Sequence, residues 1–308
     1  MTRYGYLGPV GTFCQMALGQ WGTSHDGEHI PFGSVGAALA ALRAGDIDAA
    51  MVPIENSVEG GVSATLDALS VGDQLHIIGE VLVPVTFVLA ARPGMPVAAI
   101  RAVGTHSHAW AQVRGWMERN LPDAAYVPTL STAASAQSLG EGGTAPFDAA
   151  VCAPVAASTF GLEVLAEDIG DNGGAVTRFV LVSRPGSMPD PTGRDKTTVV
   201  LFQRADRPGG LLELLEQFAV RGVNMTRLES RPTGEAMGSY CFSIDFEGHL
   251  TEERVRESLI GLKRVCMDVR FLGSYPRADG QLSMVEAGMA DVDFVRAREW
   301  IDSLTSPG

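Results

Sequence analysis

The stretch DNGGAVTRFVLVSR, residues 171–184, decides how this chain is organised. Its glycine pair, Gly173 and Gly174, permits the backbone angles of a sharp turn, and the apolar run after Arg178 has the β-branched and aromatic residues of a buried strand. We therefore expect Thr177 and Arg178 to stand where a loop enters a strand. In α/β sheets such a position presents polar side chains to a ligand.

The segment that follows is predicted to be a linker, because prolines and glycines punctuate it. It divides a chain of 308 residues, which is long enough for two hydrophobic cores. The sequence thus predicts a first domain over residues 1–184, a linker over 185–196, a second domain over 197–276 and a tail over 277–308.

Composition narrows the class of partner. A net charge of −13 would repel a nucleic-acid backbone or an anionic membrane, so neither is expected as a partner. The four cysteines are scattered without a CxxC pair, and the N-terminus has no apolar signal region, which predicts a cytoplasmic protein. No apolar run approaches the roughly 20 residues of a membrane-spanning helix. No residue cluster has metal-ligand spacing, so neither a metal nor another cofactor is expected.

The first domain repeats a pattern. Ser34 precedes an alanine-rich helix and Asp48 then leads into an apolar strand, and Ser131 and Asp148 occupy the same places in a second copy. This self-similarity predicts two lobes built alike, although two generic βα units would also produce it. Between the copies, residues 74–91 form a strand-prone run that we expect to pass between the lobes.

Two short clusters carry polar groups. Residues 8–12, Gly-Pro-Val-Gly-Thr, predict a turn that opens a helix, either as an anion site or as a purely structural turn. Glu55, Asn56 and Ser57 leave the end of a strand before a helix predicted over residues 62–69. An acid, an amide and a hydroxyl in a row can fix a ligand with several oxygens or cap that helix, and spacing leaves both interpretations open.

Five motifs occur in order over nearly all of residues 3–184: GPVGTF at 8–13, VPIENSVEG at 52–60, THSHAWAQ at 105–112, STAASA at 131–136 and TRF at 177–179. With them the chain resembles the prephenate dehydratase family. The resemblance implies a two-lobed catalytic domain like periplasmic binding proteins, and conversion of prephenate to phenylpyruvate with loss of water and carbon dioxide. It implies catalytic roles for Thr177, Arg178 and Glu55, and substrate contacts from Thr12, Phe13, Asn56, Ser57 and Phe179.

The reaction needs a dianion held, a departing hydroxyl hydrogen-bonded and water excluded. We expect Arg178 to clamp the pyruvyl carboxylate, since gripping the carboxylate that leaves would oppose decarboxylation. Thr177 would donate a hydrogen bond to the leaving oxygen. Glu55 would supply a proton if burial raised its pKa, or would orient its two neighbours, and both roles stay open. All these groups are expected to meet across one solvent-shielded gap.

Some positions are set apart from this assignment. His106 aligns with a histidine common in the family, but a histidine beside a helix start is more often a cap or a packing residue, so we leave it outside the catalytic set. The chain departs from the family pattern at Cys14, at Thr86 and Phe87, and at Ala175. These departures bear on substrate detail rather than on reaction class, and Cys14 is expected to be a small buried residue.

Strand, helix, strand, strand, helix and strand follow over residues 197–272, which is the ferredoxin-like βαββαβ order. The expected strands are 197–203, 223–231, 239–246 and 265–272, with a turn at 232–234; the helices start near residues 206–208 and at a Thr251 cap. The region resembles an ACT domain, which in this family binds phenylalanine. The resemblance implies an allosteric site at Gly209, Gly210, Leu211, Leu212, Glu229, Ser230, Arg231 and Pro232. From the residues themselves, we also expect the Asn224 amide to hydrogen-bond the ends of the amino acid.

Other interpretations accompany this one. From the residues alone, the glycine pair would serve tight helix packing, and Glu229 with Arg231 would form a salt bridge at a strand end. The predicted ligands are prephenate and, as a feedback effector, L-phenylalanine. ACT domains usually pair, so a homodimer or homotetramer is expected, with a tail helix over 291–304 docked on its own or a neighbouring subunit. Alternative functions are arogenate dehydratase and a non-catalytic amino-acid sensor.

Overall fold

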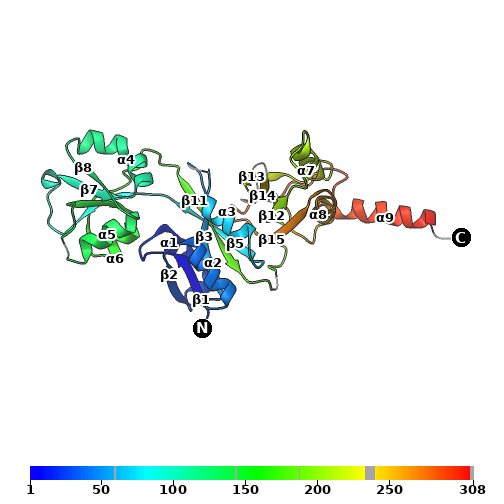
Figure 1. The fold of residues 1–308 in the computed structure, drawn as a ribbon, viewed down its shortest axis with the longest axis horizontal. Coiled ribbons are helices and arrows are strands. Elements are labelled where there is room, and N and C mark those ends of the chain that lie inside the picture. The colour runs from blue at the N-terminus through cyan, green and yellow to red at the C-terminus, as the bar shows by residue number, and fades with distance from the viewer. Residues whose placement is uncertain (59, 143, 187, 233–239, 306–308) are drawn as a thin grey trace. The chain divides into compact units, whose positions relative to one another are not determined.

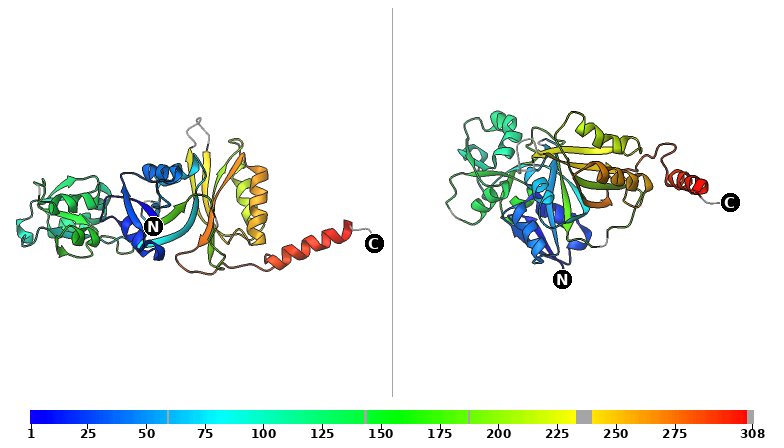
Figure 2. Two further views of the ribbon diagram at one scale, coloured as in Figure 1. Left: turned by 90° about the horizontal axis from the view of Figure 1, so that it is seen from below. Right: turned by 45° about the vertical axis from the view of Figure 1, so that its right-hand side comes forward.

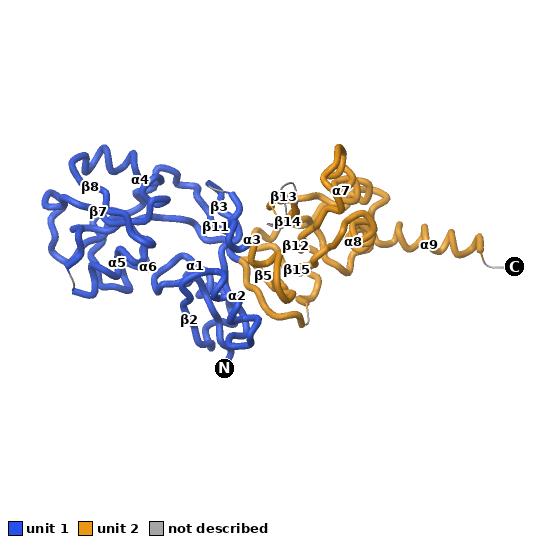
Figure 3. Tube along the Cα trace, viewed as in Figure 1, with its two compact units in different colours: residues 1–65, 81–179 blue, residues 66–80, 180–308 orange. Residues whose placement is uncertain are grey.

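The computed structural model describes residues 1–308 except 59, 143, 187, 233–239 and 306–308 (Figure 1). Its α/β architecture forms two compact units, which Figure 3 distinguishes by colour. The first unit comprises residues 1–65 and 81–179, and the second comprises residues 66–80 and 180–308.

One lobe of the first unit is built on a sheet of order β2-β1-β3-β11-β5, with β4 added to β3. Strand β1 lies between β2 and β3 and pairs in parallel with both, as the predicted βα units require. Its strands are β1 Arg3–Leu7, β2 Glu28–Phe32, β3 Ala49–Asn56, β4 Gly60–Gly61, β5 His76–Pro84 and β11 Val176–Ser183. Its helices are α1 Phe13–Gln20, η1 Gly22–Ser24, α2 Val35–Ala44 and α3 Ser63–Ser70.

The other lobe has a sheet of order β10-β6-β9-β7-β8. Its strands are β6 Val88–Ala91, β7 Ala102–Thr105, β8 Ala125–Pro128, β9 Ala149–Cys152 and β10 Glu163–Ala166. Its helices are η2 Val97–Ala99, α4 Ser107–Asn120, α5 Thr132–Gly140 and α6 Pro154–Thr159.

The prediction of two lobes is confirmed, and the repeated pattern of serine cap, helix and strand occurs in both. Ser34 accepts a hydrogen bond from the amide of Ala37 at 3.1 Å, and Ser131 accepts one from Ala134 at 3.0 Å, so both predicted caps form. The strands that follow them, β3 and β9, both occupy interior positions of their sheets. The strand-prone run 74–91 splits into β5 and β6, which belong to different sheets, so it does connect the lobes.

The second unit contains the predicted βαββαβ order (Figure 2). Its antiparallel sheet has the order β13-β14-β12-β15, and α7 and α8 pack their apolar side chains, including Phe218 and Leu262, on a core shared with that sheet. The elements are β12 Asp195–Phe202, α7 Gly210–Ala219, β13 Met225–Pro232, β14 Tyr240–Glu247, α8 Glu253–Val265 and β15 Asp268–Pro276.

Several boundaries differ from the prediction by a few residues, and three of these differences have a visible cause. Thr251 does not cap α8, because its hydroxyl bonds His249 at 2.9 Å and the helix begins two residues later. The last strand starts at Asp268, because α8 continues through Val265. Strand β12 starts within the predicted linker, since the buried Asp195 carboxylate holds the preceding turn through the amides of Thr192 and Gly193. Residues 233–234 of the expected turn lie outside the described residues.

Residues 66–80, which run from the middle of α3 into β5, pack with the second unit rather than the first. Arg270 donates to the carbonyls of Val71 and Gly72 at 3.2 and 2.9 Å. Gly273 has a φ of +136° and lies so close to Ile77 that a Cβ there would meet the Ile77 carbonyl. Only glycine tolerates both the angle and the close approach. No local pattern in the sequence indicates this grouping, because the partners of residues 66–80 lie far along the chain.

The tail forms the predicted helix, α9 Asp291–Thr305. Arg298 pairs with Glu253 and Glu257 of α8 at 2.8 and 3.5 Å, which fixes α9 to its own chain. Trp300 and Leu304 remain exposed. Among the residues that the structure describes, no helix has both the length and the apolar character needed to cross a membrane.

Candidate active site

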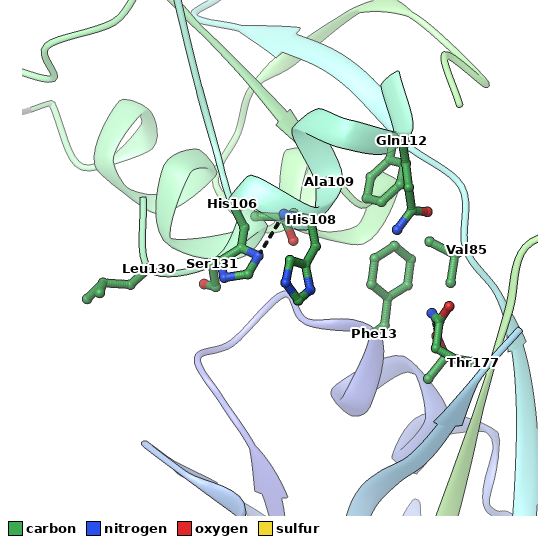
Figure 4. Close-up of a pocket in the computed structure, with 12 residues that line it drawn as sticks. Phe13, Val85, His106, His108, Ala109, Gln112, Leu130, Ser131 and Thr177 are labelled. Atoms are coloured by element: carbon green, nitrogen blue, oxygen red, sulfur yellow. Dashed lines mark hydrogen bonds between the residues drawn. The ribbon is translucent and has the colours of Figure 1, made fainter. Parts of the chain in front are cut away.

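The first unit contains a cavity of about 280 Å³ to which both lobes contribute (Figure 4). Asn56 and Thr177 come from the ends of β3 and β11, while His108 and Gln112 come from α4. Its described lining residues are Phe13, Asn56, Val85, Phe87, His106, His108, Ala109, Gln112, Leu130, Ser131, Thr132 and Thr177. Small-molecule sites commonly have this mixture of apolar surface and a few convergent polar groups.

Thr177 and Asn56 form the best-defined polar pair of the cavity. The Asn56 amide donates to Thr177 Oγ1 at 2.9 Å, while Asn56 Oδ1 accepts from the amide of Val58 at 2.8 Å. The bond from Val58 requires an oxygen at that end of the side chain, so the NH₂ group must face Thr177. Thr177 therefore accepts from Asn56, and its single proton is the one it can donate to a ligand.

Arg178 and Glu55 lie elsewhere. Arg178 Nη1 bonds Glu55 Oε2 at 3.2 Å, the Arg178 side chain is 6% exposed, and neither residue is among the described lining of the cavity. Successive side chains of a strand point to opposite faces of the sheet, so Thr177 and Arg178 lie on different faces. The described lining of this cavity therefore contains Thr177 but not Arg178, and the expectation that both face a single gap is not met by this cavity.

Of the remaining residues predicted to contact substrate, one lines the cavity and the others make structural contacts. Phe13 lines the cavity and packs edge to face on Phe87, with ring centroids 5.9 Å apart. Thr12 caps α1, and its hydroxyl donates to the Leu7 carbonyl at 3.0 Å, so the turn at residues 8–12 has a structural role. Ser57 Oγ accepts from the Val176 amide at 2.9 Å and ties β3 to β11. Phe179 is buried.

Sequence reasoning missed several lining residues on α4. His106 Nδ1 accepts from the His108 amide at 3.3 Å, which is the capping role expected of it, yet its ring also lines the cavity. Figure 4 shows His106 and His108 side by side, with ring centroids 4.9 Å apart. His108 and Gln112 are four residues apart on one helix face, so the THSHAWAQ motif could have identified both once the helix was placed.

Neither arginine nor lysine occurs among the described lining residues of the cavity. Two helices begin beside it instead, because His106 is the N-cap of α4 and Ser131 is the N-cap of α5, and both line the cavity. Unpaired backbone amides at a helix start attract anions. An acidic protein can therefore hold a carboxylate here without a buried guanidinium.

The second unit has a cavity of about 310 Å³ at the start of α7. Gly209 has a φ of +79° and precedes that helix, a conformation that glycine adopts without strain. The described lining is Gln203, Asp206, Arg207, Gly209, Gly210, Leu211, Leu212, Ser230, Tyr240 and Phe242. It includes five of the residues predicted to bind phenylalanine.

The other four predicted residues, Asn224, Glu229, Arg231 and Pro232, are not among that described lining. Arg231 forms a bidentate pair with Asp67 of α3 at 2.9 and 2.8 Å, and this hydrogen bonding raises the pKa of the guanidinium. Arg231 therefore pairs with an acid 164 positions away, in addition to the influence of Glu229, which the sequence proposes as its partner and which also raises its pKa.

The chain thus combines a two-lobed α/β domain that has one cavity with a βαββαβ domain that has another. This is the architecture of an enzyme that carries a separate small-molecule-binding domain. The sequence model of the prephenate dehydratase family matches residues 4–187. A prephenate dehydratase of Amycolatopsis methanolica is 47% identical over 302 residues, covering 98% of this chain and 97% of the relative.

Two solved structures are similar. A prephenate dehydratase from Arthrobacter aurescens in complex with L-Phe has a TM-score of 0.95 and 56% identity, covering 99% of both chains. GqqA, described as a novel type of quorum quenching acylase, has a TM-score of 0.79 and 31% identity, covering 89% of this chain and 97% of that one. The chain belongs to the prephenate dehydratase family, and it is a carbon–oxygen lyase.

Proposed function

We propose that prephenate binds in the cavity of the first unit and that Thr177 acts on its ring hydroxyl. Decarboxylation breaks the bond between the ring and its carboxylate, and the electron pair of that bond enters the ring as carbon dioxide leaves. The ring expels its hydroxyl, which takes up one proton supplied by the solvent and departs as water. Aromatisation drives the reaction, so the enzyme mainly stabilises the charge that develops on the leaving oxygen.

The single observation that carries this proposal is the bond from Asn56 to Thr177. Because Thr177 Oγ1 is occupied as an acceptor, its proton is directed to another oxygen, and a departing hydroxyl is the acceptor that gains charge. Asn56 is then a positioning residue. Its amide fixes the rotation of the hydroxyl before substrate arrives, which avoids reorganisation during the reaction.

The starts of α4 and α5, with His106 and His108, are proposed to hold the pyruvyl carboxylate. Phe13, Val85 and Phe87 would pack on the ring and keep water from the carboxylate that leaves. We further propose that Arg178 and Glu55 act indirectly, because their ion pair joins the ends of the strands that carry Thr177 and Asn56.

We propose that L-phenylalanine binds at the start of α7 and regulates turnover. The similar Arthrobacter protein was crystallised with L-Phe, and the cavity here offers free space beside Leu211, Tyr240 and Phe242. Gly209 and Gly210 leave the backbone open to an amino-acid carboxylate. Regulation then requires different affinities of phenylalanine for two states of the enzyme.

Cytoplasmic location and a dimer or tetramer are also proposed. All four cysteines are buried and unpaired, which suits a reducing compartment. The apolar side chains exposed on α9 suit a subunit contact. Light scattering coupled to size-exclusion chromatography gives the subunit number.

The test of the catalytic proposal is Thr177→Val, which keeps the shape of the side chain and removes the hydroxyl. We expect turnover of prephenate to fall by about 10²- to 10³-fold, with little change in KM, since the lost bond is strongest in the transition state. Thr177→Ser is the matched control and retains most of the rate. Equal rates for the Val variant and the wild type would remove Thr177 from the mechanism.

A calorimetric titration with phenylalanine, run beside the turnover assay, separates the enzyme from a pure sensor. A sensor would bind phenylalanine and release no carbon dioxide from prephenate. Parallel turnover of arogenate tests the neighbouring substrate.

A further inference from the structure

Residues 66–80 have contacts in the second unit, but the chain joins both of their ends to residues of the catalytic cavity. On one side α3 leads back to β3, where the amide of Val62 donates to the Ile54 carbonyl at 2.9 Å and the Thr65 hydroxyl donates to Pro53. Asn56 lies two residues after Ile54 in the same strand, β3. These two hydrogen bonds join α3 and the residue before it to the strand that presents Asn56.

On the other side, β5 continues into cavity-lining residues. Val85 and Phe87 line the cavity, and the Val85 amide donates to the Ala175 carbonyl at 2.8 Å. Ala175 lies two residues before Thr177. The segment is thus attached to both members of the Thr177 and Asn56 pair, through different strands.

Strand β13 connects the same segment to the effector cavity. Ser230 lines that cavity, while its neighbour Arg231 pairs with Asp67 of α3. Adjacent side chains of a strand point to opposite faces, so Ser230 faces the cavity while Arg231 faces Asp67. Because the two residues share one backbone, a ligand that shifts Ser230 also shifts Arg231.

The two ion pairs that hold the segment differ in exposure. Glu80 and Lys196 are 2% and 10% exposed and lie 3.1 Å apart, and Glu80 also accepts from the Ala278 amide at 3.0 Å. Asp67 and Arg231 are 52% and 27% exposed. Breaking a buried pair leaves an uncompensated charge, whereas a solvated pair can open and close at little cost. The segment therefore has a fixed end at Glu80 and a releasable contact at Asp67.

We infer that Asp67 is a positioning residue for the regulated reaction: its pair with Arg231 transmits the occupancy of the effector cavity, through α3 and β5, to Asn56 and Thr177. This inference rests on the proposed function, since it needs phenylalanine as effector. It requires no large rearrangement, because bidentate guanidinium–carboxylate geometry is sensitive to small shifts of either strand or helix.

The test is Asp67→Asn in the full-length chain, with Asp123→Asn as a matched control that removes the same charge from an exposed loop of the first unit. We measure the factor by which saturating phenylalanine changes kcat/KM for prephenate. In the wild type and the Asp123 variant we expect a factor of about 5- to 150-fold, the usual range of allosteric coupling. In the Asp67 variant we expect that factor to fall to within about twofold of unity, with basal kcat/KM and phenylalanine affinity nearly unchanged.

Each other outcome has a defined meaning. If phenylalanine neither binds nor alters turnover of the wild type, the regulatory proposal itself fails, whatever Asp67 does. If the Asp67 variant keeps the wild-type response, or loses phenylalanine binding, the transmission role of Asp67 is overturned.

A second measurement does not depend on any variant. In the wild type, phenylalanine should change amide hydrogen exchange in α3 and around Ala175 as well as in β13. Changes confined to β13 and α7 would overturn the inference even if Asp67→Asn failed to fold.

Discussion

Thr177 and Asn56 show how one fixed amide can define the chemistry of a hydroxyl. The amide occupies the acceptor side of Thr177 Oγ1 at 2.9 Å, so the proton is left to the substrate. The same alternation of side chains recurs at Ser230 and Arg231 in β13. In both motifs the residue beside the arginine faces a cavity, and the arginine holds a neighbouring element through an acid.

Asn56→Asp tests this assignment with almost no change of shape. An aspartate still accepts from Val58, but its second oxygen would accept the Thr177 proton instead of donating to the hydroxyl. We expect turnover to fall by about 10²-fold, because the donor is diverted from the leaving group. The turnover of the Asn56→Ala variant should fall less, because the Thr177 proton is then still available to the leaving hydroxyl. Steady-state assays of both variants decide, and a more active Asp than Ala variant would contradict the model of donor direction.

The buried thiols give a second residue-scale prediction. Burial raises the pKa of both Cys14 and Cys152 to about 12. A thiol reacts as the thiolate, and a higher pKa lowers the thiolate fraction at any pH below it, so near pH 8 these groups stay protonated. We expect iodoacetamide to leave both unmodified in the native protein and to modify all four cysteines after unfolding in guanidinium. Mass spectrometry counts the adducts, and rapid native labelling of Cys14 would contradict its burial.

Most helices and strands are predicted by residues that lie close together in the sequence. The serine caps of α2 and α5 and the βαββαβ order depend on residues within a few positions of one another, so the sequence displays them. The strand predicted from the apolar run 179–182 forms as Val176–Ser183, so it already includes Thr177 and Arg178. The directions of these two side chains do not follow from their closeness in the sequence, because a strand directs neighbouring side chains to opposite faces.

The grouping of residues 66–80 with the second unit could not be predicted in this way. It depends on pairs such as Asp67 with Arg231 and Glu80 with Lys196, which are 164 and 116 positions apart. Each of these residues taken alone has the composition of an ordinary surface charge. Only the folded sheet brings them together, and Gly273 permits the approach.

The buried pair of Glu80 and Lys196 gives an element-scale prediction. Lys196→Met leaves the Glu80 carboxylate buried without its cation, and we expect the free energy of unfolding to drop by about 3–5 kcal/mol. The double variant Lys196→Met with Glu80→Gln should recover part of this loss, because the uncompensated charge is gone. Urea unfolding of the four proteins of this cycle measures the coupling. Strictly additive losses would mean that the pair is not coupled.

For the whole molecule, the division of the chain by packing differs from its division by sequence. The predicted boundary at residue 184 lies in a stretch of prolines and glycines, but Asp67, Ile77 and Glu80 come before it and have their partners after residue 194. The sensor module is therefore not an appendage joined at one point. Part of the catalytic half of the sequence contributes to its packing.

This arrangement predicts the behaviour of two truncations. A chain of residues 1–184 lacks Lys196, so the Glu80 carboxylate loses its cation, and β5 loses its contacts with the second unit. We therefore expect its unfolding temperature to fall by about 10 °C or more, or the chain to aggregate. A chain of residues 1–290 loses only α9, which has no buried residue among those described, and it should unfold within a few degrees of the full-length protein. Differential scanning calorimetry compares the three.

The two cuts also separate regulation from integrity. Residues 1–290 keep the effector cavity and Arg231, so phenylalanine should still alter prephenate turnover in that chain. Adding residues 185–308 in trans to residues 1–184 should restore part of the lost stability, because the partners of residues 66–80 return with them. A chain of residues 1–184 that is as stable and as active as the full protein would show that these contacts are dispensable, and that the sensor module meets the enzyme only through its linker.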